Sequence, residues 1–249
     1  MITVSLRFYG DLNDLLTIST GQNQTTFERQ LPGPTSVKDL IEGCGVPHTE
    51  VDVILVDSKA VDFSYLIADG NRISIYPVFN SLDIPEADRL QKPTAHYPRF
   101  LADVNLGKLA RYLRLAGLDT AYRNDADDDD LIEQMQEENR VLLTRDRKLL
   151  MHKVVRHGYL PRSADPAEQL EEVLRRFDLF HELEPFSRCP RCNGSLQNVP
   201  KEEIIDRLEP LTKRHFDEFS QCIGCGQVYW AGSHRRRLDP KVKEIFDRI

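Results

Sequence analysis

The sequence predicts a mixed protein built from a small α+β roll, an α/β domain with a parallel sheet, and a C-terminal metal-binding module. Three observations predict this division. Residues 1–80 show a strand–helix–strand–strand order, residues 100–177 alternate short apolar strands with helices, and the last quarter carries two Cys-x-x-Cys pairs. Strands that alternate with helices favour a parallel sheet whose chemistry lies at the carboxyl ends of its strands.

The N-terminal part, residues 1–80, begins with a strand over residues 3–8, in which apolar and polar side chains alternate. A helix is predicted over residues 36–41, between a Thr-Ser cap and two glycines. Two further strands are predicted over residues 51–56 and 72–78. This order suits a small α+β roll.

Residues 81–98 are predicted to form a linker, because they contain three prolines and little apolar periodicity. The α/β domain is predicted over residues 99–185, and the metal-binding module over residues 186–249. Within the α/β domain, strands are expected at 100–102, 120–122 and 141–144, and helices over 106–116, around 132–136 and over 167–177.

Charge and composition restrict the class of protein. The chain has 33 Lys+Arg and 40 Asp+Glu, a net charge of -7, which excludes a uniformly basic nucleic-acid binder. Only residues 186–249 are basic, with 12 Lys+Arg against 9 Asp+Glu. The chain opens without a signal-peptide pattern, and no apolar run approaches the roughly 18 residues of a membrane span. We therefore expect a cytoplasmic protein with no membrane partner.

Acidic residues follow each predicted strand of the α/β domain. Asp103 follows the first strand, Asp146 follows the third, and Asp125 to Asp130 lie between the second strand and the next helix. A parallel sheet would bring these positions to one edge, where carboxylates need a cation and offer the oxygen ligands that Mg²⁺ or Mn²⁺ prefers. Such an ion can activate water and stabilise charge on a phosphoryl oxygen.

The structural alternative for these aspartates is common in proteins. An aspartate after a strand often caps a helix or occupies a turn. Asp127 to Asp130 could also be the solvated start of a helix that interacts with the helix dipole. The occurrence of three such positions in one domain favours the metal site.

Basic residues flank the predicted acid positions, on the helix after Asp103 and on both sides of Asp146. They suit binding of nucleic-acid phosphates next to metal-bearing carboxylates. The alternative is a set of surface salt bridges, each of which contributes little to stability. These residues are Lys108, Arg111, Arg114, Arg145 and Arg147.

Four of the five cysteines form two Cys-x-x-Cys pairs, and in a reducing compartment such pairs bind metals more often than they form disulfides. The 29 residues between the pairs exceed the usual spacing, but an insertion at the tip of a ribbon leaves four-thiolate coordination intact. We expect a structural Zn²⁺; iron in a rubredoxin-like site and redox disulfides are the alternatives. The predicted ligands are Cys189, Cys192, Cys222 and Cys225.

Aromatic and basic residues follow the second pair. Tyr229 and Trp230, with His234 and Arg235 to Arg237, could provide a stacking surface and positive charge for nucleic acid. The alternative is an aromatic core strand followed by a solvated basic turn. Cys44, outside the pairs, is expected to be a small buried or semi-buried thiol.

The α/β domain and the cysteine module together resemble the Mut7-C ribonuclease family. The resemblance lies in residues 100–114, 122–128, 142–147, 187–193 and 222–234. Members of that family are regarded as PIN-fold nucleases with a C-terminal zinc ribbon, so the resemblance implies a PIN-like fold for residues 99–185 and a zinc ribbon for 186–249.

The resemblance also implies roles for individual residues. Asp103 and Asp146 correspond to strand-end acids of a PIN site. Asp128 is the preferred third acid and Asp125 the second choice for that position. A fourth polar position is assigned to Ser163 or Asp165.

The first 80 residues resemble the ubiquitin-like domain fused to this family, which is related to small sulfur carriers through residues 7–12. Sulfur carriers end in a free Gly-Gly, whereas this segment continues through residues 76–80 into the linker. We therefore expect no thiocarboxylate chemistry, and interpret the domain as a binding module for a protein partner.

These expectations combine into a metal-dependent ribonuclease that acts on RNA and leaves a 5′-phosphate. The competing hypothesis is a non-catalytic RNA- or protein-binding adaptor built on the ribbon and the ubiquitin-like domain. A phosphoacceptor role for Asp103 in a receiver-like domain is weaker, because no suitable lysine follows a late strand.

Overall fold

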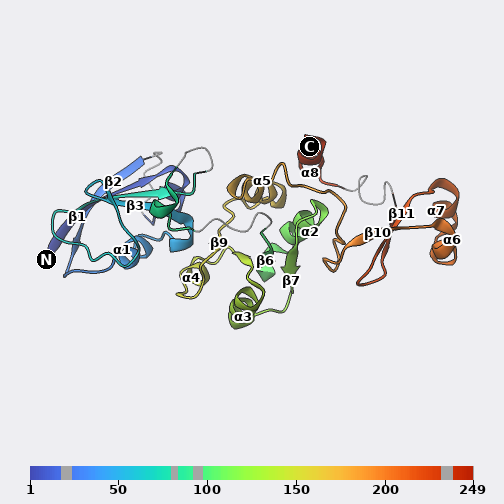
Figure 1. Cartoon of the computed structure of the whole chain (residues 1–249), viewed down its shortest axis with the longest axis horizontal. Helices are drawn as coiled ribbons and strands as arrows, with labels where there is room; N and C mark the ends of the chain where they lie inside the picture. Colours follow the sequence, from blue (N-terminus) through green and yellow to red (C-terminus); the bar gives the residue numbers. More distant parts are fainter. Residues whose placement is uncertain (18–23, 80–83, 92–97, 231–237, 249) are drawn as a thin grey trace. The chain divides into compact units, whose positions relative to one another are not determined.

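The computed structural model describes residues 1–17, 24–79, 84–91, 98–230 and 238–248 (Figure 1). The chain divides into two compact units, each assembled from three separate stretches of sequence. The first unit comprises Met1–His96, Asp128–Glu133 and Val141–Leu160, and the second comprises Tyr97–Asp127, Gln134–Arg140 and Pro161–Ile249.

The first unit contains a five-stranded sheet in the order β2-β1-β5-β3-β4. Strands β1 and β5 are parallel, and the other neighbours are antiparallel. The three predicted strands and the predicted helix are all present, whereas β2 and β4 were not predicted. The elements are β1 Ile2–Tyr9, β2 Gln24–Leu31, α1 Val37–Glu42, β3 Val51–Val56, β4 Lys59–Ala60 and β5 Arg72–Pro77.

The alternating pattern of β1 gives this sheet its buried face. Val4, Leu6 and Phe8 are all almost completely buried. Helix α1 begins where predicted, because the Ser36 hydroxyl accepts a hydrogen bond from the Asp39 amide. Short 3-10 turns connect β1 to β2 at Gly10–Leu15 and α1 to β3 at His48–Glu50, and a third follows β5 at Glu86–Asp88.

Part of the segment predicted as a linker is attached to β3. Arg89 Nη1 lies 2.6 Å from Oδ2 of Asp52, a carboxylate with no exposed surface. The Leu90 amide donates to the Asp52 carbonyl, and the Gln91 side chain donates to the carbonyls of His48 and Val51. Residues 89–91 are therefore integrated in the first unit.

The first unit also includes elements from the middle of the chain. Strand β8, Val141–Leu143, is parallel to β9, Gly158–Tyr159, and helix α4, Arg147–Leu150, lies between them in sequence. Strand β8 was predicted; α4 and β9 were not. Helix α3, Asp128–Glu138, begins in the first unit and ends in the second.

In the second unit, β6, Phe100–Ala102, is parallel to β7, Thr120–Tyr122. The predicted parallel arrangement is therefore confirmed for the β6–β7 pair and for the β8–β9 pair of the first unit. Helix α2, Gly107–Leu115, packs on α5, Pro166–Arg176, which in turn packs on α8, Pro240–Asp247. Four leucines of α2 and α5 are completely buried: Leu109, Leu113, Leu170 and Leu174.

The C-terminal part of the second unit is a three-stranded antiparallel sheet. It consists of β10, Leu196–Val199, β11, Phe219–Cys222, and β12, Val228–Trp230. Helices α6, Lys201–Ile204, and α7, Pro210–His215, lie between β10 and β11, and they account for the long spacing between the cysteine pairs. Among the described residues, no helix is both long and apolar enough to cross a membrane.

Candidate functional site

The four paired cysteines converge at one point of the second unit. Their Sγ atoms all lie within 4.8 Å of one another, so the group could hold a metal ion. Each pair closes a turn: the Asn193 amide donates to the Cys189 carbonyl, and the Gly226 amide donates to the Cys222 carbonyl. Asn193 and Gly226 both adopt positive φ, which explains the turn-forming residue after each pair.

A buried tyrosine contacts this group. The Tyr229 hydroxyl lies 3.0 Å from Cys189 Sγ. Burial raises the pKa of Cys189, but hydrogen bonds from Tyr229 and from the amides of Cys192 and Arg191 outweigh it and lower that pKa to about 7. A stabilised thiolate is the form that binds a metal. Four thiolate donors with a hydrogen-bonding outer residue fit a tetrahedral ion such as Zn²⁺.

The two aromatic residues of β12 have packing roles. Tyr229 is buried beside Cys189, and Trp230 packs with Phe216 against an apolar cluster next to the β10–β12 sheet, with the centroids of the Trp230 and Phe216 rings 6.2 Å apart. These positions agree with the core-strand alternative, not with an exposed stacking surface. His234 and Arg235 to Arg237 lie outside the described residues.

Arg114 connects the cysteine turn to the α/β part of the second unit. It is 5% exposed, and it donates to the carbonyls of Thr120 at 2.8 Å, Arg191 at 3.1 Å and Pro190 at 3.4 Å. Burial lowers its pKa. The expectation that Arg114 offers its charge to phosphate is therefore wrong, because its guanidinium is buried against backbone carbonyls.

A second network, not predicted from sequence, surrounds Asp119. Arg140 Nη1 lies 2.7 Å from Asp119 Oδ1, and the Asn193 side-chain amide donates to the same oxygen at 2.8 Å. Arg188 lies 3.4 Å from the other carboxylate oxygen. Burial raises the pKa of Asp119, but the hydrogen bonds from Arg140 and Asn193 outweigh it, so the pKa is lowered. Asp119 therefore joins β6–β7 to the cysteine turn.

Two of the candidate acids belong to the second unit. Asp103 directly follows β6 at the start of a 3-10 turn, makes no side-chain cap and is 6% exposed. Asp125 follows β7 and is exposed, with its Oδ1 3.3 Å from Arg123 Nε. The sequence prediction that Asp103 ends a strand is confirmed.

The other two candidate acids belong to the first unit. Asp146 caps α4, because its Oδ1 accepts from the amides of Lys148 at 2.7 Å and Leu149 at 3.4 Å. Asp128 is the first residue of α3 and is exposed. Two of the four carboxylates belong to each unit, and the convergence of all four stays a prediction.

The two residues considered for a fourth polar position both have structural partners. Asp165 caps α5 by accepting from the Ala167 amide at 2.8 Å, and it pairs with Lys241 at 3.1 Å. The Ser163 hydroxyl donates to Glu168 at 2.7 Å. Their role at a metal site stays a prediction.

The basic candidates differ in exposure. Lys108, Arg111 and Arg145 are exposed, and the Lys108 ammonium lies 5.7 Å from the centre of the Tyr112 ring. Arg147 is half-buried and donates to the carbonyls of Leu15 and Gly45 in the first unit.

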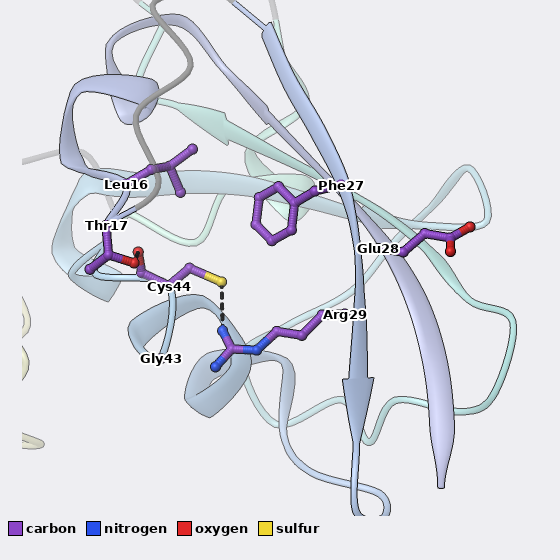
Figure 2. Close-up of a pocket in the computed structure, with 7 residues that line it drawn as sticks. All are labelled: Leu16, Thr17, Phe27, Glu28, Arg29, Gly43 and Cys44. Atoms are coloured by element: carbon purple, nitrogen blue, oxygen red, sulfur yellow. Dashed lines mark hydrogen bonds between the residues drawn. The ribbon is translucent and has the colours of Figure 1, made fainter.

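A pocket lies in the first unit between β2 and the end of α1 (Figure 2). Arg29 Nη1 donates to Cys44 Sγ at 3.0 Å there. Burial raises the pKa of Cys44, which keeps the thiol protonated and agrees with the predicted buried thiol. The lining residues are Leu16, Thr17, Phe27, Glu28, Arg29, Gly43 and Cys44.

A family model described as the Mut7-C RNAse domain matches residues 98–242, more than half of the chain. The chain belongs to the Mut7-C family. A second family model, Mut7-C ubiquitin, matches residues 1–83. No curated protein and no solved structure matches the chain significantly. The matched Mut7-C RNAse domain contains the four paired cysteines and all four candidate acids.

Proposed function

We propose that this Mut7-C protein is a metal-dependent ribonuclease that hydrolyses RNA phosphodiester bonds. The observation that carries the proposal is the match of residues 98–242 to the Mut7-C RNAse domain. Asp103 follows β6, which is parallel to β7, and Asp146 follows β8, which is parallel to β9. Polar residues at the carboxyl ends of parallel strands are where α/β folds place their chemistry.

In this proposal Asp103, Asp146 and Asp128 hold one or two Mg²⁺ or Mn²⁺ ions, with Asp125 the alternative third acid. A bound divalent cation supplies activation of water and compensation for charge on the phosphoryl group. Asp103 contributes a carboxylate that is shielded from solvent, and the cap that Asp146 forms on α4 fixes its orientation.

Exposed cations would bind the RNA backbone. Lys108 and Arg111 on α2, and Arg145 after β8, present charge to solvent. Arg147 was also predicted to bind phosphate. Because its guanidinium donates to the carbonyls of Leu15 and Gly45, we propose that its main role is to hold the chain next to Asp146. In-line attack of water would leave a 5′-phosphate.

The remaining assignments are structural. We assign residues 1–80 to a ubiquitin-like domain with a protein partner and residues 99–185 to a PIN-like domain, with residues 81–98 as the linker between these two. We assign residues 186–249 to a zinc ribbon. A closed four-thiolate site gives Zn²⁺ a folding role, and it suits a reducing compartment such as the cytoplasm.

The test is cleavage of single-stranded and structured RNA by the zinc-loaded full chain, with and without Mn²⁺. The Asp103→Asn/Asp146→Asn double variant should lose cleavage by at least about 100-fold. Asp217→Asn is the matched control, because Asp217 is an exposed aspartate that pairs with Lys201, and it should cleave like the wild type.

Equal cleavage by the wild type and the double variant would overturn the catalytic assignment. RNA binding without cleavage in any divalent metal would support the non-catalytic adaptor instead. A crystal structure of the Mn²⁺-soaked protein would test directly whether the carboxylates converge.

A further inference from the structure

Residues 147–160, which directly follow Asp146, are held by groups from the first 50 residues of the chain. All of these contacts lie within the first unit. They involve the side chains of Arg147, His48 and Glu50, and each of them is hydrogen-bonded to backbone of the other segment. Hydrogen bonds in which one partner is charged are among the stronger polar contacts in proteins.

The first contact is made by Arg147, next to Asp146. Its Nη1 donates to the Leu15 carbonyl at 2.6 Å and to the Gly45 carbonyl at 3.5 Å. Gly45 has φ +95°, and a Cβ there would lie 2.9 Å from Thr17 Cγ2 and 3.0 Å from the Leu15 carbonyl oxygen. The close approach of Arg147 to this turn therefore depends on a glycine.

The second contact is made by His48, which is 7% exposed. Its Nδ1 lies 2.7 Å from Glu42 Oε1, and its Nε2 lies 2.8 Å from the Val155 carbonyl oxygen. Each ring nitrogen of His48 therefore has a hydrogen-bonding partner, one a side chain and the other a backbone carbonyl. The histidine thus joins α1 to the backbone just before β9.

The third contact is made by Glu50, which is 2% exposed. Its Oε1 accepts a hydrogen bond from the Leu160 amide at 2.7 Å. A buried carboxylate is costly unless it is hydrogen-bonded, so this contact is a strong constraint on the chain just after β9. His48 and Glu50 therefore hold β9 on both sides.

These contacts reach Asp146 through short, rigid connections. Strand β9 pairs with β8, and the Thr144 amide donates to the Tyr159 carbonyl at 3.2 Å. The Thr144 hydroxyl accepts from the Asp146 amide at 2.9 Å, and Asp146 caps the helix in which Arg147 is the first residue. Asp146 is thus bounded by β8 on one side and by the Arg147 contact on the other.

The geometry points to a positioning role for the ubiquitin-like domain: Gly45, His48 and Glu50 hold residues 147–160 so that the Asp146 carboxylate is correctly placed. This inference rests on the proposed catalytic role of Asp146. Catalysis is sensitive to such placement, since a displacement of about 1 Å can cost on the order of 100-fold in rate. The domain would therefore act on the reaction without touching RNA.

The test compares Glu50→Ala with Glu50→Gln in the full chain. Glutamine keeps a side-chain oxygen that can accept from the Leu160 amide, whereas alanine removes it. We expect Glu50→Ala to increase hydrogen exchange of amides in residues 147–160 and to lower kcat about tenfold with KM unchanged. Glu50→Gln should show exchange and kcat values close to those of the wild type. Asp62→Asn is the control, because Asp62 caps an exposed turn of the same domain through Ser64.

A second variant keeps the test valid if Glu50→Ala fails to fold. Gly45→Ala acts on the Arg147 contact instead, and it should raise exchange around residues 147–151 and lower kcat in the same way. Unchanged exchange in residues 147–160 in the folded variants would show that the contacts do not hold the segment. Increased exchange with an unchanged kcat would show that they do not position Asp146, and either result overturns the inference. Absence of cleavage by the wild type would instead refute the proposed function, and the positioning role with it.

Discussion

The Tyr229 hydroxyl lies 3.0 Å from the Sγ of Cys189, and both side chains are buried. This contact makes strand β12 part of the cysteine site, although none of its residues is a thiol. Residues that hydrogen-bond to metal ligands orient them and tune their affinity for the metal. Tyr229 is therefore expected to influence metal binding from outside the ligand set.

Replacing Tyr229 by Phe should weaken metal binding while leaving the β10–β12 sheet folded. The ring is retained, but the hydrogen bond to Cys189 is lost, and outer-residue changes of this kind typically cost about 10- to 100-fold in metal affinity. Competition with a zinc chelator measures the change. Trp230→Phe, the neighbouring residue on the same strand, should leave the affinity unchanged; an equal loss in both variants would contradict the role of the hydroxyl.

Arg111 and Arg114, one turn apart on α2, should respond differently to replacement by alanine. Arg111→Ala should weaken RNA binding and reduce the slope of log affinity against log salt by about one, because an exposed cation is removed. Arg114→Ala should leave that slope unchanged and lower the free energy of unfolding by about 3 kcal/mol, because it leaves buried carbonyls without their donor. Binding titrations over a salt series, with urea unfolding, separate the two. A reduced salt slope for Arg114→Ala would contradict its structural role.

Asp119 should contribute stability that depends on pH. Its pKa is lowered in the folded protein by Arg140 and Asn193, which outweigh the effect of burial. A group with a lowered pKa stabilises the fold above its unfolded pKa of about 4, and that contribution is lost as the pH falls through the folded pKa.

We therefore expect Asp119→Asn to lower the free energy of unfolding by about 2 kcal/mol at pH 7. The difference from the wild type should shrink toward pH 3. Urea unfolding at both pH values provides the measurement, and Asp217→Asn, an exposed aspartate paired with Lys201, should change stability by less than about 0.5 kcal/mol. A difference of equal size at both pH values would refute the charge-based explanation.

Gly107 should be sensitive to a single added methyl group. A Cβ at this position would lie 2.6 Å from the Tyr122 hydroxyl oxygen, although the backbone, with φ -59°, would accept any residue. Gly107→Ala should therefore destabilise the chain by about 1–3 kcal/mol through overpacking. Thermal unfolding checks this, and Gly33→Ala is the control because a Cβ there meets nothing within 4 Å.

The double variant Gly107→Ala/Tyr122→Ala identifies the cause. If the clash with Tyr122 is responsible, the double variant should be more stable than the sum of the two single changes predicts. Additive effects would mean that the glycine is required for another reason.

The fold was predictable where burial imposes a clear pattern. Apolar and polar residues alternate in β1 because only one face of that strand is buried. Strand β8 is a continuous apolar run because both of its faces are buried. Strand β2 escaped prediction because Gln24–Leu31 is an edge strand with mostly polar residues, and it is defined by its pairing with β1. Strand β9 has two residues, too few to show any period.

The cysteine site was predictable because its ligands occur in pairs with a fixed spacing, whereas the roles of the basic residues were not. Lys108, Arg111 and Arg114 look alike in sequence, yet Arg114 is buried because its partners are carbonyls at Thr120, Pro190 and Arg191. Asp119 likewise finds partners at Arg140 and Asn193. The contacts with Pro190, Arg191 and Asn193 span more than 70 residues of sequence, and such contacts leave no local pattern.

The interleaved course of the chain has a consequence for dissecting the protein. Each compact unit is assembled from three stretches that alternate in sequence, so the chain passes from one unit to the other five times. A fragment limited to residues 98–242 would keep β8, α4 and β9 but lose the first 96 residues of their unit. The extent of the family match is thus not a suitable boundary for a truncated expression product, because it separates β8, α4 and β9 from the sheet of their own unit.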